Sequence, residues 1–256
     1  MSGRLDGVGI VITRPRPAAE ALAAALVREG ARPFIFPALA IEDLPHSDAL
    51  ESALAILPRA ALAIFVSAHA VQKGIAAAAR HGSWPAGPRV AAIGEATAEA
   101  LRAAGFRSVV SPHERHDSEA LLALPELEQV AGRDVVIFRG EGGREHLREV
   151  LESRGARVSY AQCYRRVRPA ADAAPLLQGW SRGEVDAVSA LSAETLENFV
   201  AMIGEEGARR LGSTTLVVPH EAIAGHALAR RFARVAVAGP GAEGIAVALS
   251  PSRAHP

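Results

Sequence analysis

A segment near the middle of the chain repeats a segment near its start, and this repeat constrains the fold more than any other feature. Residues 136–157 match residues 11–32 without a gap, with nine identities across 22 positions. An offset of 125 residues also relates two further pairs of segments: Ser67-Ala68 with Ser192-Ala193, and 90–93 with 215–218. Strand-turn-helix units share a common apolar pattern, so a chance similarity is the alternative explanation of these matches. A constant offset over three blocks favours duplication.

The second copy has the pattern of a strand, a turn and a helix. Residues 135–138 are a short apolar run, which is typical of a buried parallel strand. A glycine-rich turn follows at 139–143, and 144–154 carries apolar residues at the spacing of one helical face. Gly155 then stands where a helix ends in a left-handed residue. The duplicated unit is therefore a strand followed by a helix.

Ten short apolar segments alternate with stretches of helical periodicity along the chain. The predicted strands are 9–13, 33–37, 62–66, 90–93, 108–110, 135–138, 158–164, 186–191, 215–218 and 235–238. Alternation of this kind is typical of parallel sheets covered by helices on both faces. The predicted fold class is α/β, with two five-stranded, doubly wound domains.

The domain boundary has two interpretations. A cut near Gln129 separates the two copies of the repeat. Alternatively, the extended segments 38–43 and 164–169 run side by side, which makes residues 42–165 one domain and joins the two ends into the other. Both divisions give five strands to each domain, so periodicity does not choose between them.

Composition excludes several classes of protein. The 28 basic and 28 acidic residues give no net charge, which argues against a general nucleic-acid binder. The single cysteine, Cys163, excludes an internal disulfide, and its place at the end of an apolar run predicts a core thiol. No signal peptide or membrane span is visible, so we expect a cytoplasmic protein without a membrane partner.

The candidate binding residues lie in the turns that follow the strands, because ligands of open parallel sheets bind beyond the carboxyl ends. Backbone N–H groups at helix starts suit anions there, and Arg14 and Arg139 stand at the same turn of the two copies. Ser67, Thr97 and Ser192 open helices, so capping alone is the alternative explanation for them. Gly140 and His220 belong to two further turns of this set.

Known catalytic motifs are not recognisable in the sequence. The glycines at 140, 142 and 143 do not form a dinucleotide-binding fingerprint, and neither a P-loop nor a nucleophile elbow is visible. The spacing of His113, His116 and Asp117 would allow a metal site, but a solvated loop is the better interpretation. We therefore predict no metal and no cofactor.

Several blocks of the sequence, in this order, resemble the uroporphyrinogen-III synthase family. They are VITRP with GARPFIFPALAIE, AIFVSAHAV, VAAIGEATAEALRAAGF, SEALL, VVIFRGEGGREHLREVLESRGA and CYRR. The resemblance covers nearly the whole chain. It implies two flavodoxin-like domains joined by a two-stranded linker, with 1–38 and 169–256 in one domain and 42–165 in the other.

The family resemblance also implies the activity. These enzymes are cofactor-free lyases of tetrapyrrole, porphyrin and haem biosynthesis, and they close linear hydroxymethylbilane to uroporphyrinogen III. Water is lost, and ring D is inverted through a spiro intermediate. The implied substrate is a linear tetrapyrrole with eight carboxylates, and the preceding hydroxymethylbilane-forming enzyme is a candidate partner. A monomer is expected.

The resemblance assigns roles to particular residues. The family's active-site tyrosine falls on Tyr164, although a packing role at the strand end is the alternative. Its binding hydroxyls fall on Ser67, Thr97 and Ser192. Where many relatives have a glycine followed by threonines, this chain has 218–222, so His220 is a candidate replacement. The rival function is a two-lobed α/β binding or sensor protein that closes on a small polyanionic ligand.

Overall fold

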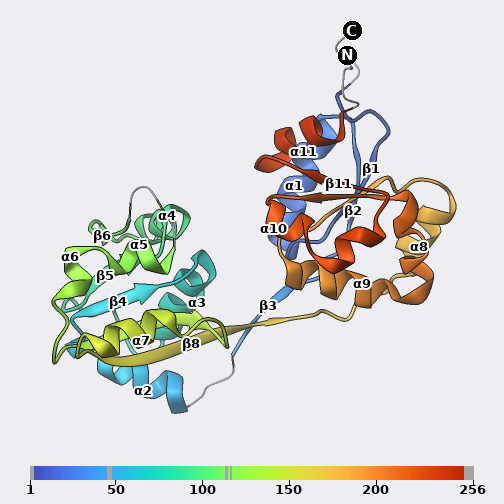
Figure 1. The fold of residues 1–256 in the computed structure, drawn as a ribbon. Helices are drawn as coiled ribbons and strands as arrows, with labels where there is room; N and C mark the ends of the chain where they lie inside the picture. The colour runs from blue at the N-terminus through green and yellow to red at the C-terminus, as the bar shows by residue number, and fades with distance from the viewer. Residues whose placement is uncertain (1–2, 45–47, 113–114, 116, 251–256) are drawn as a thin grey trace, which may run out of the picture. The chain divides into compact units, whose positions relative to one another are not determined.

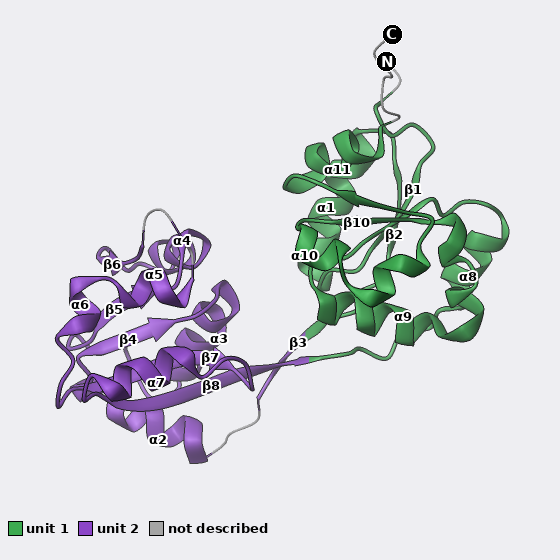
Figure 2. Ribbon diagram, in the orientation of Figure 1, with its two compact units in different colours: residues 1–40, 167–256 green, residues 41–166 purple. Residues whose placement is uncertain are grey.

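The chain folds into two compact units (Figure 1, Figure 2). The computed structural model describes residues 3–44, 48–112, 115 and 117–250. Unit 1 comprises residues 1–40 and 167–256, and unit 2 comprises residues 41–166. The chain therefore passes from one unit to the other twice, and Gln129, the alternative boundary, lies within unit 2.

Unit 1 is a five-stranded sheet in the order β11-β10-β9-β1-β2, and all its pairs are parallel. Read along the chain, this is the 2-1-3-4-5 order of flavodoxin-like folds. Its elements are β1 (Gly9–Ile12), α1 (Arg16–Arg28), β2 (Arg32–Ile35), α8 (Ala174–Ser181), β9 (Ala187–Ser189), α9 (Ala193–Ala208), η2 (Leu211–Ser213), β10 (Thr215–Val218), α10 (Glu221–Ala224), η3 (Ala227–Arg231), β11 (Arg234–Val237) and α11 (Gly241–Leu249).

Unit 2 is built on a six-stranded sheet in the order β3-β8-β7-β4-β5-β6. Strands β4 to β8 pair in parallel. Its elements are β3 (Ala40–Asp43), α2 (Asp48–Ile56), η1 (Leu57–Arg59), β4 (Leu62–Phe65), α3 (Ala68–Ala79), β5 (Arg89–Ala92), α4 (Glu95–Ala103), β6 (Val109–Val110), α5 (Ser118–Leu122), α6 (Pro125–Glu128), β7 (Asp134–Gly140), α7 (His146–Ser153) and β8 (Arg157–Val167).

Both sheets are covered by helices on their two faces, as the alternation of strands and helices predicted. In unit 2, Phe65 and Phe138 pack in a core with α2, α3 and α4, whereas Ile64 and Ile137 pack in a second core with α5, α6 and α7. Unit 1 likewise has one core under α8 and α9 and another under α1 and α11. The predicted α/β class with parallel sheets is confirmed.

The sequence repeat is visible in the strand registers. Gly9 of β1 pairs with Arg32 of β2, and Asp134 of β7 pairs with Arg157 of β8, each 125 residues further along the chain. The equivalent strands therefore lie in different units. Unit 1 takes β1 and β2 from the first copy and β9, β10 and β11 from the second, while unit 2 takes the remainder of each copy.

The offset changes by one residue after β9. Leu62 pairs with Arg89 in unit 2, but its counterpart Ala187 pairs with Thr215 in unit 1. The structurally equivalent offset for β10 and β11 is therefore 126 rather than the 125 expected from sequence matching.

The observed elements add to and differ from the predicted ones in detail. The described residues contain eleven strands rather than ten, because part of the extended segment 38–43 forms β3 beside β8. Strand β8 extends beyond the predicted strand 158–164 as far as Val167. Residues 221–231 form two short helical pieces, since Gly225 ends α10 and His226 caps η3. None of the described helices is long and apolar enough to cross a membrane.

Candidate active site

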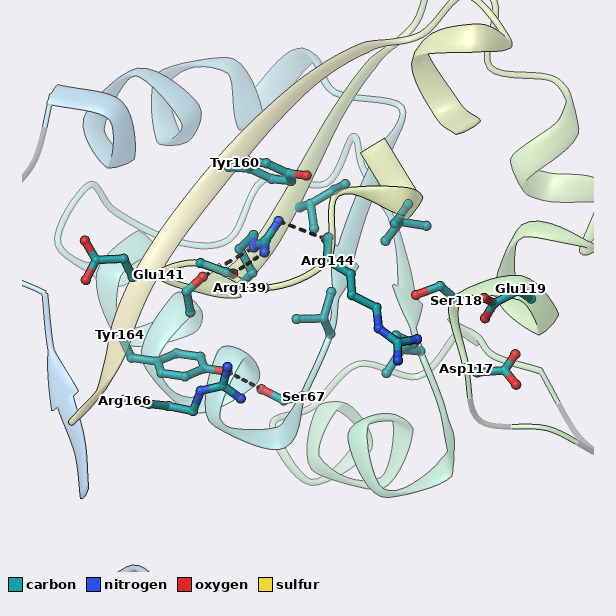
Figure 3. Close-up of a pocket in the computed structure, with 17 residues that line it drawn as sticks. Ser67, Asp117, Ser118, Glu119, Arg139, Glu141, Arg144, Tyr160, Tyr164 and Arg166 are labelled. Carbon is teal, nitrogen blue, oxygen red and sulfur yellow. Dashed lines mark hydrogen bonds between the residues drawn. The ribbon is translucent and has the colours of Figure 1, made fainter. Parts of the chain in front are cut away.

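An open pocket of about 340 Å³ lies at the carboxyl ends of β4 and β7 in unit 2 (Figure 3). Four residues singled out in the sequence line it: Ser67, Arg139, Gly140 and Tyr164. Ser67 follows β4, Arg139 and Gly140 end β7, and Tyr164 lies in the adjacent β8. Neighbouring parallel strands end at the same edge of a sheet, which brings these residues together.

Tyr164 and Ser67 are joined by a hydrogen bond. The Tyr164 hydroxyl lies 3.0 Å from Ser67 Oγ, and either oxygen can donate. Ser67 is also the N-cap of α3, because its Oγ accepts a hydrogen bond from the amide of Ala70 at 3.0 Å. Capping and a role in the site are therefore compatible at Ser67. The Tyr164 residue as a whole is only 7% exposed, so its ring is held in place by packing.

The Arg139 side chain is bonded mainly to its own loop, although the residue lines the pocket. The residue is 6% exposed. Its guanidinium donates hydrogen bonds to backbone carbonyls of Gly140, Gly142 and Arg144 and to Glu145 Oε1. These acceptors belong to the glycine-rich loop and the turn that starts α7. The binding of a substrate carboxylate by Arg139 stays a prediction.

Tyr160 and Glu145 were not singled out in the sequence, yet they complete this network. The Tyr160 hydroxyl donates to Glu145 Oε2 at 2.7 Å, and the Arg139 guanidinium lies 4.4 Å from the centre of the Tyr160 ring. Burial and the bond to Glu145 raise the pKa of Tyr160 to about 12. The Tyr160 hydrogen bond, together with Arg139, lowers the pKa of Glu145. At neutral pH the network is therefore a phenol, a carboxylate and a guanidinium.

Charged residues of both signs line the remainder of the pocket. Arg144 and Arg166 lie on its wall, and so do Asp117, Glu119 and Glu141. In Figure 3, Arg144 extends from the glycine-rich loop towards the start of α5, where Ser118 lies. Arg144 directly follows the glycine-rich turn in the sequence, Asp117 was considered there only as part of a metal motif, and Glu119 was not singled out.

The other predicted residues of unit 1 lie at the carboxyl ends of three adjacent strands. Arg14 follows β1, Ser192 follows β9 and His220 follows β10, which is the order β10-β9-β1 in the sheet. Ser192 caps α9, since its Oγ accepts from the Thr195 amide at 3.1 Å. His220 is exposed at the start of α10 and makes no capping bond with its side chain.

Arg14 has a buried donor without a partner. Within the described part of the chain, its Nε is buried and has no hydrogen-bond acceptor. Burial lowers the pKa of Arg14. A buried, unpaired N–H costs free energy unless a ligand satisfies it, so Arg14 meets the requirements of an anion-binding residue.

Two further predictions concern Thr97 and Cys163. Thr97 lies in the first turn of α4 and is only 4% exposed; it does not cap this helix, because Gly94 occupies the cap position. Cys163 is a buried free thiol, as expected, and burial raises its pKa to about 12.

The motif that the sequence analysis weighed as a metal site is only partly described, because His113 and His116 lie outside the described residues. Among the residues that the structure does describe, His, Cys, Asp and Glu do not form a group of three or more that could hold a metal ion.

These features define a class: an α/β protein of two flavodoxin-like units, with polar and cationic groups at the carboxyl edge of each sheet. Solved structures share this fold. A mutant uroporphyrinogen III synthase from Thermus thermophilus matches with a TM-score of 0.58 and 21% identity, covering 89% of this chain and 92% of that one. The uroporphyrinogen-III synthetase from Helicobacter pylori matches with a TM-score of 0.57 and 14% identity, covering 95% and 99%. At these identities the likeness concerns the fold alone.

Sequence similarity identifies the family. A family model described as uroporphyrinogen-III synthase HemD matches residues 20–246. The uroporphyrinogen-III synthase of Salmonella typhimurium is 39% identical over 193 residues, which cover 75% of this chain and 78% of the relative. That of Escherichia coli is 35% identical over 199 residues, covering 77% and 80%. The chain belongs to the uroporphyrinogen-III synthase family.

Proposed function

We propose that the chain closes hydroxymethylbilane to uroporphyrinogen III, with loss of water and inversion of ring D. The observation that carries this proposal is the family match, which spans residues 20–246 and includes the pocket in unit 2. It favours an enzyme of tetrapyrrole biosynthesis over the rival sensor, and it supports a linear tetrapyrrole as the substrate.

The reaction needs control of geometry more than chemical activation. The C–O bond of the terminal hydroxymethyl group breaks, the hydroxyl leaves as water, and an electrophilic azafulvene remains. Ring D attacks this carbon through its substituted position and forms a spiro intermediate. Fragmentation and renewed closure then give the inverted ring. Unassisted closure gives the uninverted isomer, so the protein has to hold the chain in the less accessible arrangement.

Tyr164 is the residue best placed to assist departure of the hydroxyl. Ser67 Oγ already accepts the Ala70 amide, which leaves its O–H able to donate to the Tyr164 oxygen. In that arrangement the phenol proton is available to the departing hydroxyl. A phenol at this position can donate a hydrogen bond to the departing hydroxyl. Ser67 then orients Tyr164 and does not itself react.

Carboxylate binding has candidate groups in both units. In unit 1, the unpaired Nε of Arg14 can donate to a carboxylate, with Ser192 and His220 at the ends of the neighbouring strands. In unit 2, Arg144 lines the pocket, and the amides of the glycine-rich loop add further donors. Charge-assisted bonds of this kind are short and roughly twice as strong as neutral ones.

A coupled assay tests the function. Hydroxymethylbilane is generated in situ by the enzyme that forms it, and the product is oxidised and its isomers are separated by chromatography. The proposal predicts that the type III isomer rises in proportion to added protein, without added metal or nucleotide. Formation of the type I isomer alone, at the rate of the protein-free reaction, would refute it. The cytoplasmic location, the monomeric state and an association with the preceding enzyme stay predictions.

A further inference from the structure

The side chain of Arg139 is enclosed by its own loop. Its Nε donates to the carbonyl of Gly140 at 3.3 Å, and its Nη1 donates to that of Arg144 at 3.4 Å. Its Nη2 donates to the carbonyl of Gly142. One rigid guanidinium therefore fixes three carbonyl groups of residues 140–144, here called the glycine loop. A lysine could not do this, because it lacks the planar fork of donors.

A second set of contacts holds the guanidinium itself. Glu145 Oε1 accepts from Nη1 at 3.1 Å, and the Tyr160 ring lies against the guanidinium at 4.4 Å. The Tyr160 hydroxyl in turn donates to Glu145 Oε2 at 2.7 Å. An ion pair, a stacked ring and a hydrogen bond between the two supporting residues thus fix the orientation of Arg139.

The glycine loop is also the support on which Tyr164 rests. The amide of Glu141 donates to the carbonyl of Tyr164 at 2.8 Å. A Cβ on Gly140 would lie 2.6 Å from Cε2 of the Tyr164 ring, so the loop backbone is in close contact with the face of the phenol. A displacement of the loop would therefore displace the ring, whose hydroxyl bonds Ser67 on the other side (Figure 3).

We propose that Arg139 is a positioning residue of the closure reaction, which acts through the glycine loop to fix Tyr164, with Glu145 and Tyr160 as its supports. This rests on the function proposed above. Arg139 uses four of its five N–H donors on the loop and on Glu145, which favours a positioning role over a substrate contact. A misplacement of about 1 Å in a reacting group costs about 10²-fold in rate, which sets the expected effect on kcat.

A double-mutant cycle separates positioning from other roles. Arg139→Met, Tyr164→Phe and the double variant are assayed with synthetic hydroxymethylbilane. Each single variant should lower kcat by about 10²-fold and leave KM within about threefold, and the double variant should be no slower than about 10²-fold. Independent effects would multiply to about 10⁴-fold, which would overturn the proposal. So would a raised KM at unchanged kcat in Arg139→Met, the signature of a substrate contact.

A second pair of variants covers the case in which Arg139→Met does not fold. A Cβ on Gly143 would lie 2.8 Å from Arg139 Nη2, and its φ is +99°, so Gly143→Ala pushes the loop away while the arginine is retained. Gly105→Ala is the matched control, because its φ is +100° and open space surrounds the new methyl group. We expect Gly143→Ala to lower kcat at least about tenfold and Gly105→Ala to retain the wild-type value. Wild-type turnover in Gly143→Ala would contradict the proposal.

Hydrogen exchange of the Glu141 amide gives a readout that does not need activity. Arg139→Met and Gly143→Ala should accelerate exchange of this amide by about tenfold or more, and Gly105→Ala should not. If the wild-type protein fails to turn over hydroxymethylbilane, the proposed function falls while this measurement still tests the loop. Unchanged protection of the Glu141 amide in both loop variants would overturn the positioning role.

Discussion

The two copies of the repeat place an arginine at the same position after the same strand, and the two side chains have different surroundings. Arg139 is surrounded by loop carbonyls and Glu145. Arg14, its counterpart 125 residues earlier, has a buried Nε without an acceptor among the described residues. Equivalent arginines therefore differ in their surroundings: Arg139 is bonded to its own loop, whereas Arg14 Nε is left open for the proposed carboxylate.

The difference follows from where the next helix begins. In unit 1, Pro15 leads directly into α1, which begins at Arg16. In unit 2, α7 begins only at His146, and residues 140–145, between Arg139 and this helix, include three glycines. Because those residues are not helical, their carbonyls are free to turn towards Arg139 instead of bonding within a helix.

The supporting residues have diverged as well. Glu145 pairs with Arg139, whereas its counterpart Glu20 pairs with Arg16 at 3.4 Å. Ile35 takes the place of Tyr160 in the first copy and cannot supply the hydroxyl. Identity of the arginine alone was thus a poor guide to its role, since the role depends on the residues around it.

The largest expected difference between the two arginines is the effect of their removal on the free energy of unfolding of their own unit. Arg139→Met leaves three carbonyls and Glu145 without their partner, so the free energy of unfolding of unit 2 should fall by about 3 kcal/mol. Arg14→Met removes a half-buried side chain whose Nε has no acceptor among the described residues, so the free energy of unfolding of unit 1 should not fall and should rise by about 1 kcal/mol.

The two tryptophans allow these changes to be measured separately, because Trp84 lies in unit 2 and Trp180 in unit 1. Urea unfolding of unit 2 is followed by Trp84 fluorescence in a Trp180→Phe background. Unfolding of unit 1 is followed by Trp180 fluorescence in a Trp84→Phe background. Arg89→Met is the control in unit 2, since the Arg89 pair with Glu126 is at the other edge of the sheet and the arginine side chain is 59% exposed. Its loss should cost less than about 1 kcal/mol. Equal destabilisation by Arg139→Met and Arg14→Met would contradict the proposed difference between the two arginines.

Tyr164 has no counterpart in the first copy, where Leu39 stands at the 125-residue offset. Tyr164→Phe keeps the ring on the glycine loop and removes the hydroxyl, so kcat should fall by about 10²-fold, the low end for a proton donor. The product should remain the type III isomer, because the contacts that set geometry are unchanged. Full activity with a sharply lowered thermal midpoint would instead identify a packing residue.

Arg14→Met should act on binding more than on stability. If Arg14 donates to a substrate carboxylate, its loss should weaken binding by about 1–3 kcal/mol, read as an increased KM for hydroxymethylbilane. Arg16→Met is the matched control, because Arg16 is exposed and its ion pair with Glu20 is a surface one. An unchanged KM in Arg14→Met would exclude the receptor role.

The smallest expected effect concerns the way in which the stability of unit 2 depends on pH. The hydrogen bond from Tyr160 and the proximity of Arg139 lower the pKa of Glu145 in the folded protein. The ionised carboxylate therefore stabilises unit 2 above the unfolded-state pKa of about 4.3, and this contribution is lost as pH falls through the lower folded-state value. Glu145→Gln should reduce stability at pH 7 and lose its deficit in acid. A deficit independent of pH would contradict this assignment.

The sequence predicted the layout well, because both signals that define it are periodic. Short apolar runs alternating with helices specify parallel strands with covered faces, and the constant offset specifies duplicated units. Helix starts at Ser67 and Ser192 were also predictable, since serine in a strand-to-helix turn is a strong N-cap signal.

The surroundings of each side chain were not predictable. Strict alternation along β8 would put Tyr160 and Tyr164 on the same face. The bulge between Arg139 and Gly140 shifts the register, and the two rings pack in different cores. The partners of Arg139 depend on this bulge and on the late start of α7, neither of which leaves a periodic signal.

The most direct test of the contrast between the two arginines is an NMR titration of their Nε–H resonances. The resonances are assigned with Arg14→Lys and Arg139→Lys variants, and uroporphyrinogen III, kept reduced, is added as the ligand. We predict that the Arg14 resonance moves as its unpaired Nε gains an acceptor, while the Arg139 resonance stays in place because its Nε already bonds Gly140. Movement of the Arg139 resonance with Arg14 unaffected would contradict the account.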